Sequence, residues 1–255
     1  MRSRNRLAGK FIGRPLGAIN SHACLLPAWS SSRPLSSIEY FADTASRTAL
    51  DQYFVTILNL LFTKLQNSPS DSFKLRFVRF YHLVSAYVEA GLGADYFIAQ
   101  VDSIQANIFT PVYLSVILPT SDQLVANDRR LAVISFAKTL TESTAFAQRY
   151  VKGWRFTCEA MLKMLANAPK VTLGAGDEIV NVADVDDIGF GLGFTPLSTC
   201  KRQHGRDEFP EIQDLPQWVR QYLTEANQRT GGTIANYVQE RLDDQGKQAL
   251  ALYMG

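Results

Sequence analysis

Residues 48–90, TALDQYFVTILNLLFTKLQNSPSDSFKLRFVRFYHLVSAYVEA, contain the clearest indication of the fold. Its apolar side chains recur every three or four positions in two runs, which is the spacing of one face of an α-helix. Pro69 separates the runs because it cannot continue a helix, and Ser70 or Asp71 can cap the second run. We therefore predict two antiparallel helices joined by a tight turn, the first over residues 48–66.

The same pattern continues along the chain after Gly91 and Gly93 stop the second helix. Thr110 and Pro111 suggest a cap followed by a proline in the first turn, Pro119 an end or a kink, and Asp128 another cap. Helix starts near residues 48, 95 and 128 give a period of about 33 to 47 residues, the range of HEAT-type repeats. We predict an all-α fold, a HEAT-type α-solenoid of antiparallel helix pairs, with further helices over residues 95–109, 111–119, 128–140, 148–167, 217–230 and 233–253.

Residues 1–47 differ in composition from the rest. They are rich in Arg, Ser, Gly and Pro and lack helical periodicity, so we predict a disordered or mispredicted N-terminal segment ahead of a domain at 48–255. An Arg-rich, Ser-rich and acid-poor start is also typical of a mitochondrial transit peptide, which stays open as an alternative.

The composition excludes several broad classes. The 26 Lys+Arg residues nearly balance the 24 Asp+Glu residues, so no overall field favours nucleic acid or an anionic membrane. The longest apolar runs are about ten residues, against roughly 20 for a membrane span, so no membrane insertion is expected. Three widely spaced cysteines fit neither a disulfide framework nor a zinc motif and favour a reducing compartment.

No motif carries catalytic or cofactor chemistry. The glycines of Gly189-Phe190-Gly191-Leu192-Gly193 have the wrong spacing for a dinucleotide loop and follow acidic residues that would repel phosphate. His82 is interpreted as a helix-boundary histidine, and Arg76 and Arg79 as a solvated face. We predict no enzyme activity, no cofactor and no metal site.

The acidic segment 177–187 is the candidate for a partner contact. It lacks the spacing of an EF-hand, so a solvated acidic loop or a docking strip for a basic partner are the two interpretations. The strip that we single out consists of Asp184, Asp186 and Asp187.

Several passages resemble, in order, the C-terminal domain of the CAS family of nuclear exportins, in a form closest to the fungal members. They are RFVRFYHLVSAYVEAGLGADYF, IQANIFTPVYLSVILP, ISFAKTLTES, DVDDIGFGLGFTPLSTC and IANYVQERLDDQGKQALALYM. Together they span about residues 49 to 255. The resemblance implies a HEAT-repeat exportin that carries importin-α out of the nucleus with Ran-GTP, shuttling between nucleus and cytoplasm.

Family members are much longer, and the N-terminal repeats that make the principal Ran contact have no counterpart in this sequence. The alternative is an orphan truncated helical-repeat protein without transport activity, directed to mitochondria. Because a solenoid repeat buries its faces against both neighbours, we expect Leu50, Phe54 and Phe77 to be partly exposed.

Overall fold

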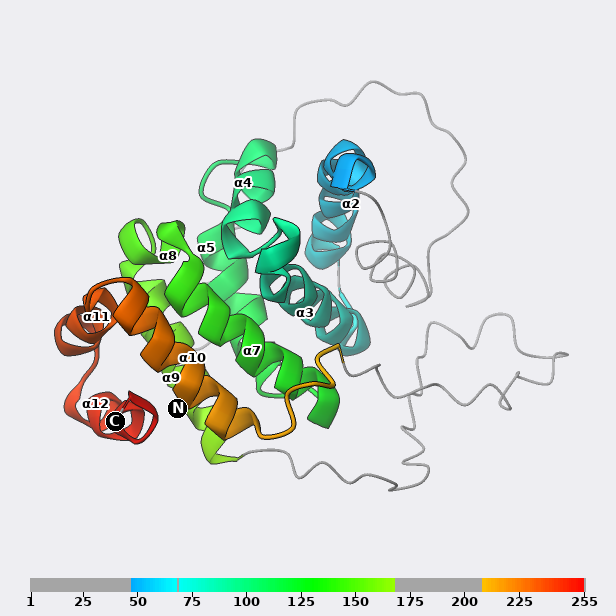
Figure 1. Ribbon diagram of the computed structural model, residues 1–255. Helices are drawn as coiled ribbons and strands as arrows, with labels where there is room; N and C mark the ends of the chain where they lie inside the picture. Colours follow the sequence, from blue (N-terminus) through cyan, green and yellow to red (C-terminus); the bar gives the residue numbers. More distant parts are fainter. Residues whose placement is uncertain (1–46, 68, 168–207, 255) are drawn as a thin grey trace, which may run out of the picture. The chain divides into compact units, whose positions relative to one another are not determined.

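The computed structural model describes residues 47–67, 69–167 and 208–254, and these residues form helices and connecting turns with no strand among them (Figure 1). The predicted N-terminal segment, apart from Arg47, lies outside the described residues. The elements are α2 (Arg47–Gln66), α3 (Asp71–Ala86), the 3₁₀ turn η2 (Val88–Ala90), α4 (Ala94–Ile104), α5 (Phe109–Val112), the π-helical turn η3 (Tyr113–Ile117), α6 (Leu118–Ser121), α7 (Ala126–Glu142), α8 (Thr144–Gln148), α9 (Val151–Ala166), α10 (Leu215–Arg229), α11 (Thr233–Arg241) and α12 (Asp244–Met254).

The first predicted helix pair is confirmed. Ser70 caps α3 by accepting from the Phe73 N–H at 3.2 Å. Ring contacts join Phe54 to Phe80 at 5.8 Å and Phe62 to Phe77 at 6.1 Å. Positions that rise along α2 therefore meet positions that fall along α3, so the two helices are antiparallel.

Two predicted caps are wrong. The helix that contains Thr110 begins one residue earlier, at Phe109, and follows Ile108 without a side-chain cap. α7 begins at Ala126, so Asp128 lies inside its first turn. Its carboxylate pairs instead with a cation on another helix, a non-local partner that periodicity cannot reveal.

Pro119 does not end its helix. The preceding turn widens, so that the Leu118 N–H bonds to the Tyr113 carbonyl five residues earlier, and the helix continues as α6. Proline lacks an N–H and crowds the carbonyl four residues before it. A π-turn just before Pro119 relieves that crowding within the helix.

The long helix predicted over 233–253 is two helices. Leu242 has an extended backbone (φ −94°, ψ 149°), and the Asp243 carboxylate accepts from the Gly246 N–H at 2.8 Å. An aspartate that bonds an N–H three residues later is a helix N-cap. The extended backbone at Leu242 therefore ends α11, and the cap by Asp243 starts α12.

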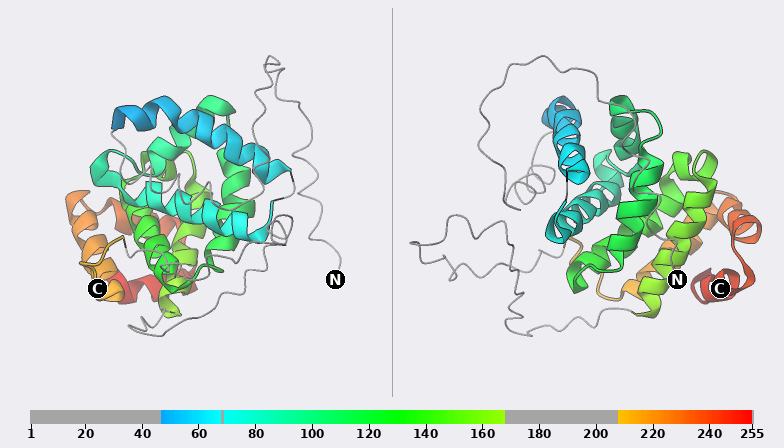
Figure 2. Two further views of the ribbon diagram at one scale, coloured as in Figure 1. Left: turned by 90° about the vertical axis from the view of Figure 1, so that its right-hand side faces the viewer. Right: turned by 180° about the vertical axis from the view of Figure 1, so that it is seen from behind.

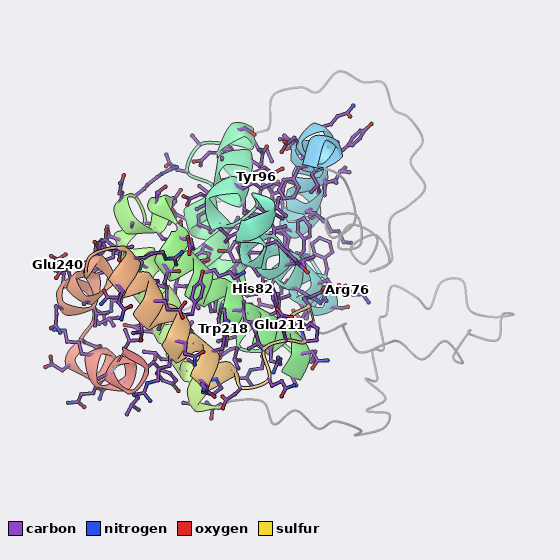
Figure 3. All side chains as sticks on the ribbon, in the orientation of Figure 1. Arg76, His82, Tyr96, Glu211, Trp218 and Glu240 are labelled. Carbon is purple, nitrogen blue, oxygen red and sulfur yellow. The ribbon has the colours of Figure 1, made fainter. Side chains whose placement is uncertain are left out.

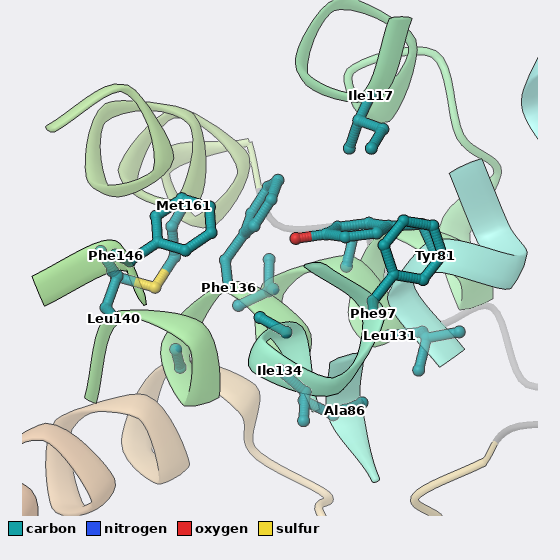
Figure 4. Packing of buried hydrophobic residues seen from close by; sticks show 14 of the residues in the cluster. Tyr81, Ala86, Phe97, Ile117, Leu131, Ile134, Phe136, Leu140, Phe146 and Met161 are labelled. Carbon is teal, nitrogen blue, oxygen red and sulfur yellow. The ribbon is translucent and has the colours of Figure 1, made fainter. Parts of the chain in front are cut away.

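Helices α3, α7 and α10 follow one another as neighbours, while α4, α9 and α12 pack behind them in turn (Figures 1 and 2). The core runs between these helices and is rich in aromatic rings (Figure 4). The prediction of a partly exposed first pair is wrong for the residues chosen, because Leu50, Phe54 and Phe77 are 3%, 1% and 0% exposed. They pack within the pair and against α4, where Phe54 meets Tyr96 and Phe97.

None of the helices in the described ranges is both long enough and apolar enough to cross a membrane.

Candidate functional site

The predicted partner-contact strip, Asp184, Asp186 and Asp187, lies outside the described residues, as do the glycines at 189–193. The chain leaves the described structure after Asn167, at the end of α9, and re-enters it at Glu208. We therefore take the described residues that follow this segment, from Glu208 onward, as the candidate site, because their contacts are known.

Residues 208–214, which we name the strap, lie against α3 and α7 ahead of α10 (Figure 3, where Glu211 marks the strap and Arg76 marks α3). The Arg79 guanidinium on α3 donates to Asp128 of α7 at 2.8 Å and to Glu208 of the strap at 3.0 Å. The Tyr87 hydroxyl also donates to Glu208, at 3.4 Å. One side chain thus joins three separate stretches of the chain.

This arrangement corrects the interpretation of Arg79 as a solvated residue, since its side chain is only 12% exposed. Burial raises the pKa of Asp128, and the charge of Arg79 offsets part of that rise. A half-buried carboxylate is tolerated here because a guanidinium lies directly beside it.

Two further cations under the strap are almost fully buried, Arg130 at 5% and Lys138 at 4% exposure. Arg130 donates to the carbonyl oxygens of Phe209 and Ile212. Lys138 donates to the Ala86 carbonyl at 2.8 Å and lies 5.1 Å from the centre of the Phe209 ring. These cations satisfy carbonyls that the irregular backbone of the strap and the end of α3 would otherwise leave unpaired.

Phe209 is the apolar anchor of the strap. Its ring lies 5.5 Å from the Tyr87 ring and is 9% exposed. The Ile212 N–H bonds to the Phe209 carbonyl at 3.1 Å, so Pro210 and Glu211 form a tight turn between two buried side chains. The strap is held by aromatic packing, a turn and buried charges together.

The strap residues were not predicted from the sequence. A usable signal was present, because Arg130 and Lys138 stand eight positions apart in the apolar run RRLAVISFAKTL and so fall on one helix face. Cations on the buried face of a helix need partners, and the short acidic and apolar segment Glu208 to Ile212 supplies them.

The histidine and the cysteine that fall within the described ranges, His82 and Cys158, are both buried. His82 is 0% exposed, with its ring nitrogens 2.8 Å from the Ser121 hydroxyl and 3.1 Å from the Ser135 hydroxyl. Burial lowers its pKa to about 3 and raises the pKa of the Cys158 thiol to about 12. The interpretation of His82 as a helix-boundary residue is therefore wrong, and it is a core histidine. Within the described ranges no three metal-ligating side chains gather at one place.

Three comparisons bear on this arrangement. The family model described as "CAS/CSE protein, C-terminus" matches residues 36–253. The importin-alpha re-exporter of Schizosaccharomyces pombe is 27% identical over 80% of this chain and 22% of its own length. The importin alpha re-exporter of Saccharomyces cerevisiae is 26% identical over 78% of this chain and 20% of its own length. Human exportin-2 is 23% identical over 81% of this chain and 21% of its own length.

Among solved structures, the exportin Cse1 in its cargo-free, cytoplasmic state superposes with a TM-score of 0.65 at 18% identity, covering 87% of this chain and 22% of that one. This likeness confirms the predicted fold class, an all-α solenoid of HEAT type. The chain spans about a fifth of the length of the curated relatives it matches.

Proposed function

This chain belongs to the CAS/CSE family, and from that membership we propose that it serves as the C-terminal part of a nuclear export receptor. In this role it is a protein-binding scaffold that helps return importin-α to the cytoplasm in complex with Ran-GTP. The family match over residues 36–253 carries the proposal. The stacked helices support it, because solenoids of this kind usually act as extended binding surfaces.

The cargo contact that we propose is the acidic strip of Asp184, Asp186 and Asp187. Importin-α has a basic segment, and three carboxylates with no Lys or Arg between residues 171 and 200 complement it. The segment that bears the strip is tied to the helical stack at both ends, by α9 and by the strap.

The experiment is a binding titration of importin-α against the chain, with and without Ran-GTP, in parallel with a variant in which the three aspartates are Asn. Exposed ion pairs contribute roughly 0.5 kcal/mol each, so losing three should weaken binding about tenfold. The dependence of the dissociation constant on salt should flatten as well, because fewer charges are screened.

A matched control changes three carboxylates on the described surface away from the strap, Glu225 and Glu240 to Gln and Asp244 to Asn. All three are exposed, and the net charge changes by the same amount. We expect the control to bind importin-α as the unmodified chain does. If both variants bound importin-α equally weakly, the loss of affinity would follow from net charge alone. If the Asn variant bound as the unmodified chain does, the acidic strip would not be the cargo contact.

We propose shuttling between nucleus and cytoplasm as the location. The Arg-rich and acid-poor residues 1–48 supply the observation behind the mitochondrial alternative. A fluorescent fusion of residues 1–48 separates the two, since mitochondrial signal favours the orphan helical protein and diffuse or nuclear signal favours the receptor.

A further inference from the structure

Helix α2 carries apolar side chains around more of its circumference than its buried face requires. Phe54 and Leu58 belong to that buried face and are 1% and 0% exposed. Tyr53 and Leu60 are 50% and 44% exposed, and they stand seven positions apart, so they lie on one line along the helix, two turns from each other. Ile57 lies between them and is partly buried. We name Tyr53, Ile57 and Leu60 the α2 stripe.

The neighbouring helices pack on a different side of α2. Phe54 lies 5.8 Å from the Phe80 ring of α3 and 6.2 Å from the Phe97 ring of α4. Each residue of a helix is turned about 100° from the one before it, so the line of Tyr53 is turned well away from that of Phe54. α2 stands at the edge of the described helices in Figures 1 and 2. The described part of the chain therefore leaves the two outer side chains of the stripe open to solvent.

A single exposed apolar side chain needs no explanation in a folded protein. The α2 stripe differs because further residues of the same family domain stand directly before it in the chain. The family match begins at residue 36, whereas α2 begins at Arg47. Residues 36–46, SSIEYFADTAS, lie outside the described residues. They are therefore the part of the family domain that is closest in sequence to the uncovered side of α2.

The sequence of residues 36–46 suits a partner for the stripe. Ile38 and Phe41 are apolar and three positions apart, which places them on one side of a helical turn. Asp43, Thr44 and Ser46 follow, and residues of these types favour turns and helix caps. A reversal of the chain is therefore favoured between Phe41 and the start of α2.

The lengths allow the two stretches to meet. Tyr53 lies about 9 Å and Ile57 about 15 Å along α2 from Arg47, at 1.5 Å per residue. Phe41 and Ile38 precede Arg47 by six and nine residues, and an extended chain of that length reaches about 20 and 30 Å. The distance from Phe41 to Ile38 in a helical turn is about one turn, as is the distance from Tyr53 to Ile57. An antiparallel course therefore brings both pairs together.

We propose that residues 36–46 turn back along α2 and cover its stripe, with Phe41 against Tyr53 and Ile38 against Ile57. The contact removes from water apolar surface that the edge of the helical stack otherwise exposes. The folded domain then begins ahead of α2. This contact is independent of the proposed transport role.

A double-mutant cycle in urea unfolding of the full chain tests the contact. Phe41→Ala and Tyr53→Ala should each raise the unfolding equilibrium constant. The double variant should raise it about fivefold less than the product of the two, because both changes remove the same aromatic contact. Leu252→Ala is the control partner for Phe41→Ala, since Leu252 is 71% exposed on α12, and these two effects should multiply. Effects of Phe41→Ala and Tyr53→Ala that multiply as well would overturn the proposal.

Hydrogen exchange and sedimentation separate this occupant from a second copy of the chain. The amides of residues 36–46 should be protected in the unmodified chain and lose their protection in Leu60→Asp, which places a charge within the stripe. Amides that are unprotected in the unmodified chain, or that stay protected in Leu60→Asp, would overturn the proposal. A dimer that Leu60→Asp dissociates would assign the stripe to a second copy and would overturn it too.

Discussion

Acidification should destabilise this fold through His82, and the size of the effect can be worked out from its surroundings. The ring lies 0% exposed between Ser121 and Ser135, with Phe136 packed edge-on at 4.9 Å. Burial lowers its pKa in the folded chain to about 3, against an ordinary value near 6.5 in the unfolded chain. Between these values the unfolded chain binds a proton that the folded chain excludes.

The sign follows from that difference. Stability is independent of this group above pH about 6.5 and falls by about 1.4 kcal/mol per pH unit below it, until the folded pKa is reached. Going from pH about 7.5 to about 5 should therefore cost about 2 kcal/mol through His82 alone. This is a substantial part of the net stability of an ordinary domain.

The assay is urea unfolding at both pH values for the unmodified chain and for His82→Gln. The glutamine amide can still donate to one serine and accept from the other, but it does not titrate. His22 and His204 are present in both proteins, so their contributions cancel. The unmodified chain should lose about 2 kcal/mol more than the variant on acidification. An equal loss of unfolding free energy in the two proteins would refute this reasoning, because it would show that the folded chain binds a proton at His82 or that water reaches the ring.

Two further substitutions probe the contacts between elements. Phe209→Ala should cost about 3 kcal/mol, because it leaves a cavity against Tyr87 and removes the ring under Lys138, and the melting temperature should drop by about 6 to 12 °C. The control Phe156→Ala, at a ring that is 40% exposed, should cost under about 1 kcal/mol, and equal melting temperatures for the two variants would refute the role of the strap. Asp95→Ala should cost about 2 kcal/mol in urea unfolding, since this carboxylate accepts from the N–H and hydroxyl of Thr144 and from two neighbours at the start of α8. Asp51→Ala, at an exposed carboxylate that accepts from the Tyr96 hydroxyl and stands within α2, not at a helix N-terminus, is its control, and a similar loss there would contradict the capping role.

Interactions between residues close together in the chain could be predicted from the sequence, and interactions between distant residues could not. The helices of the first pair and the cap at Ser70 were predictable, because the stripe and the cap depend on residues three or four positions apart. The cap at Asp128 failed for the opposite reason. Its carboxylate pairs with Arg79, which is 49 positions away in the chain.

Local competition explains the errors in helix boundaries. The break after Arg241 depends on Asp243, whose carboxylate accepts from the Gly246 N–H in the same turn. An aspartate can be recognised as such a cap in the sequence only where a helix is already expected to begin next to it. Pro119 misled for a related reason. A proline that breaks one helix is accommodated in another by a wider turn, and neighbouring packing selects between the two outcomes.

The helical class, the first helix pair, the repeat period and the family could all be predicted from the amino-acid sequence, because they depend on spacing along the chain. Which polar residues enter the core depends on how the helices pack. His82 meets Ser135 from 53 positions away, and Arg79 meets Glu208 from 129 positions away. A buried charge or imidazole is stable only beside its partner, and the partner is chosen by how the helices pack.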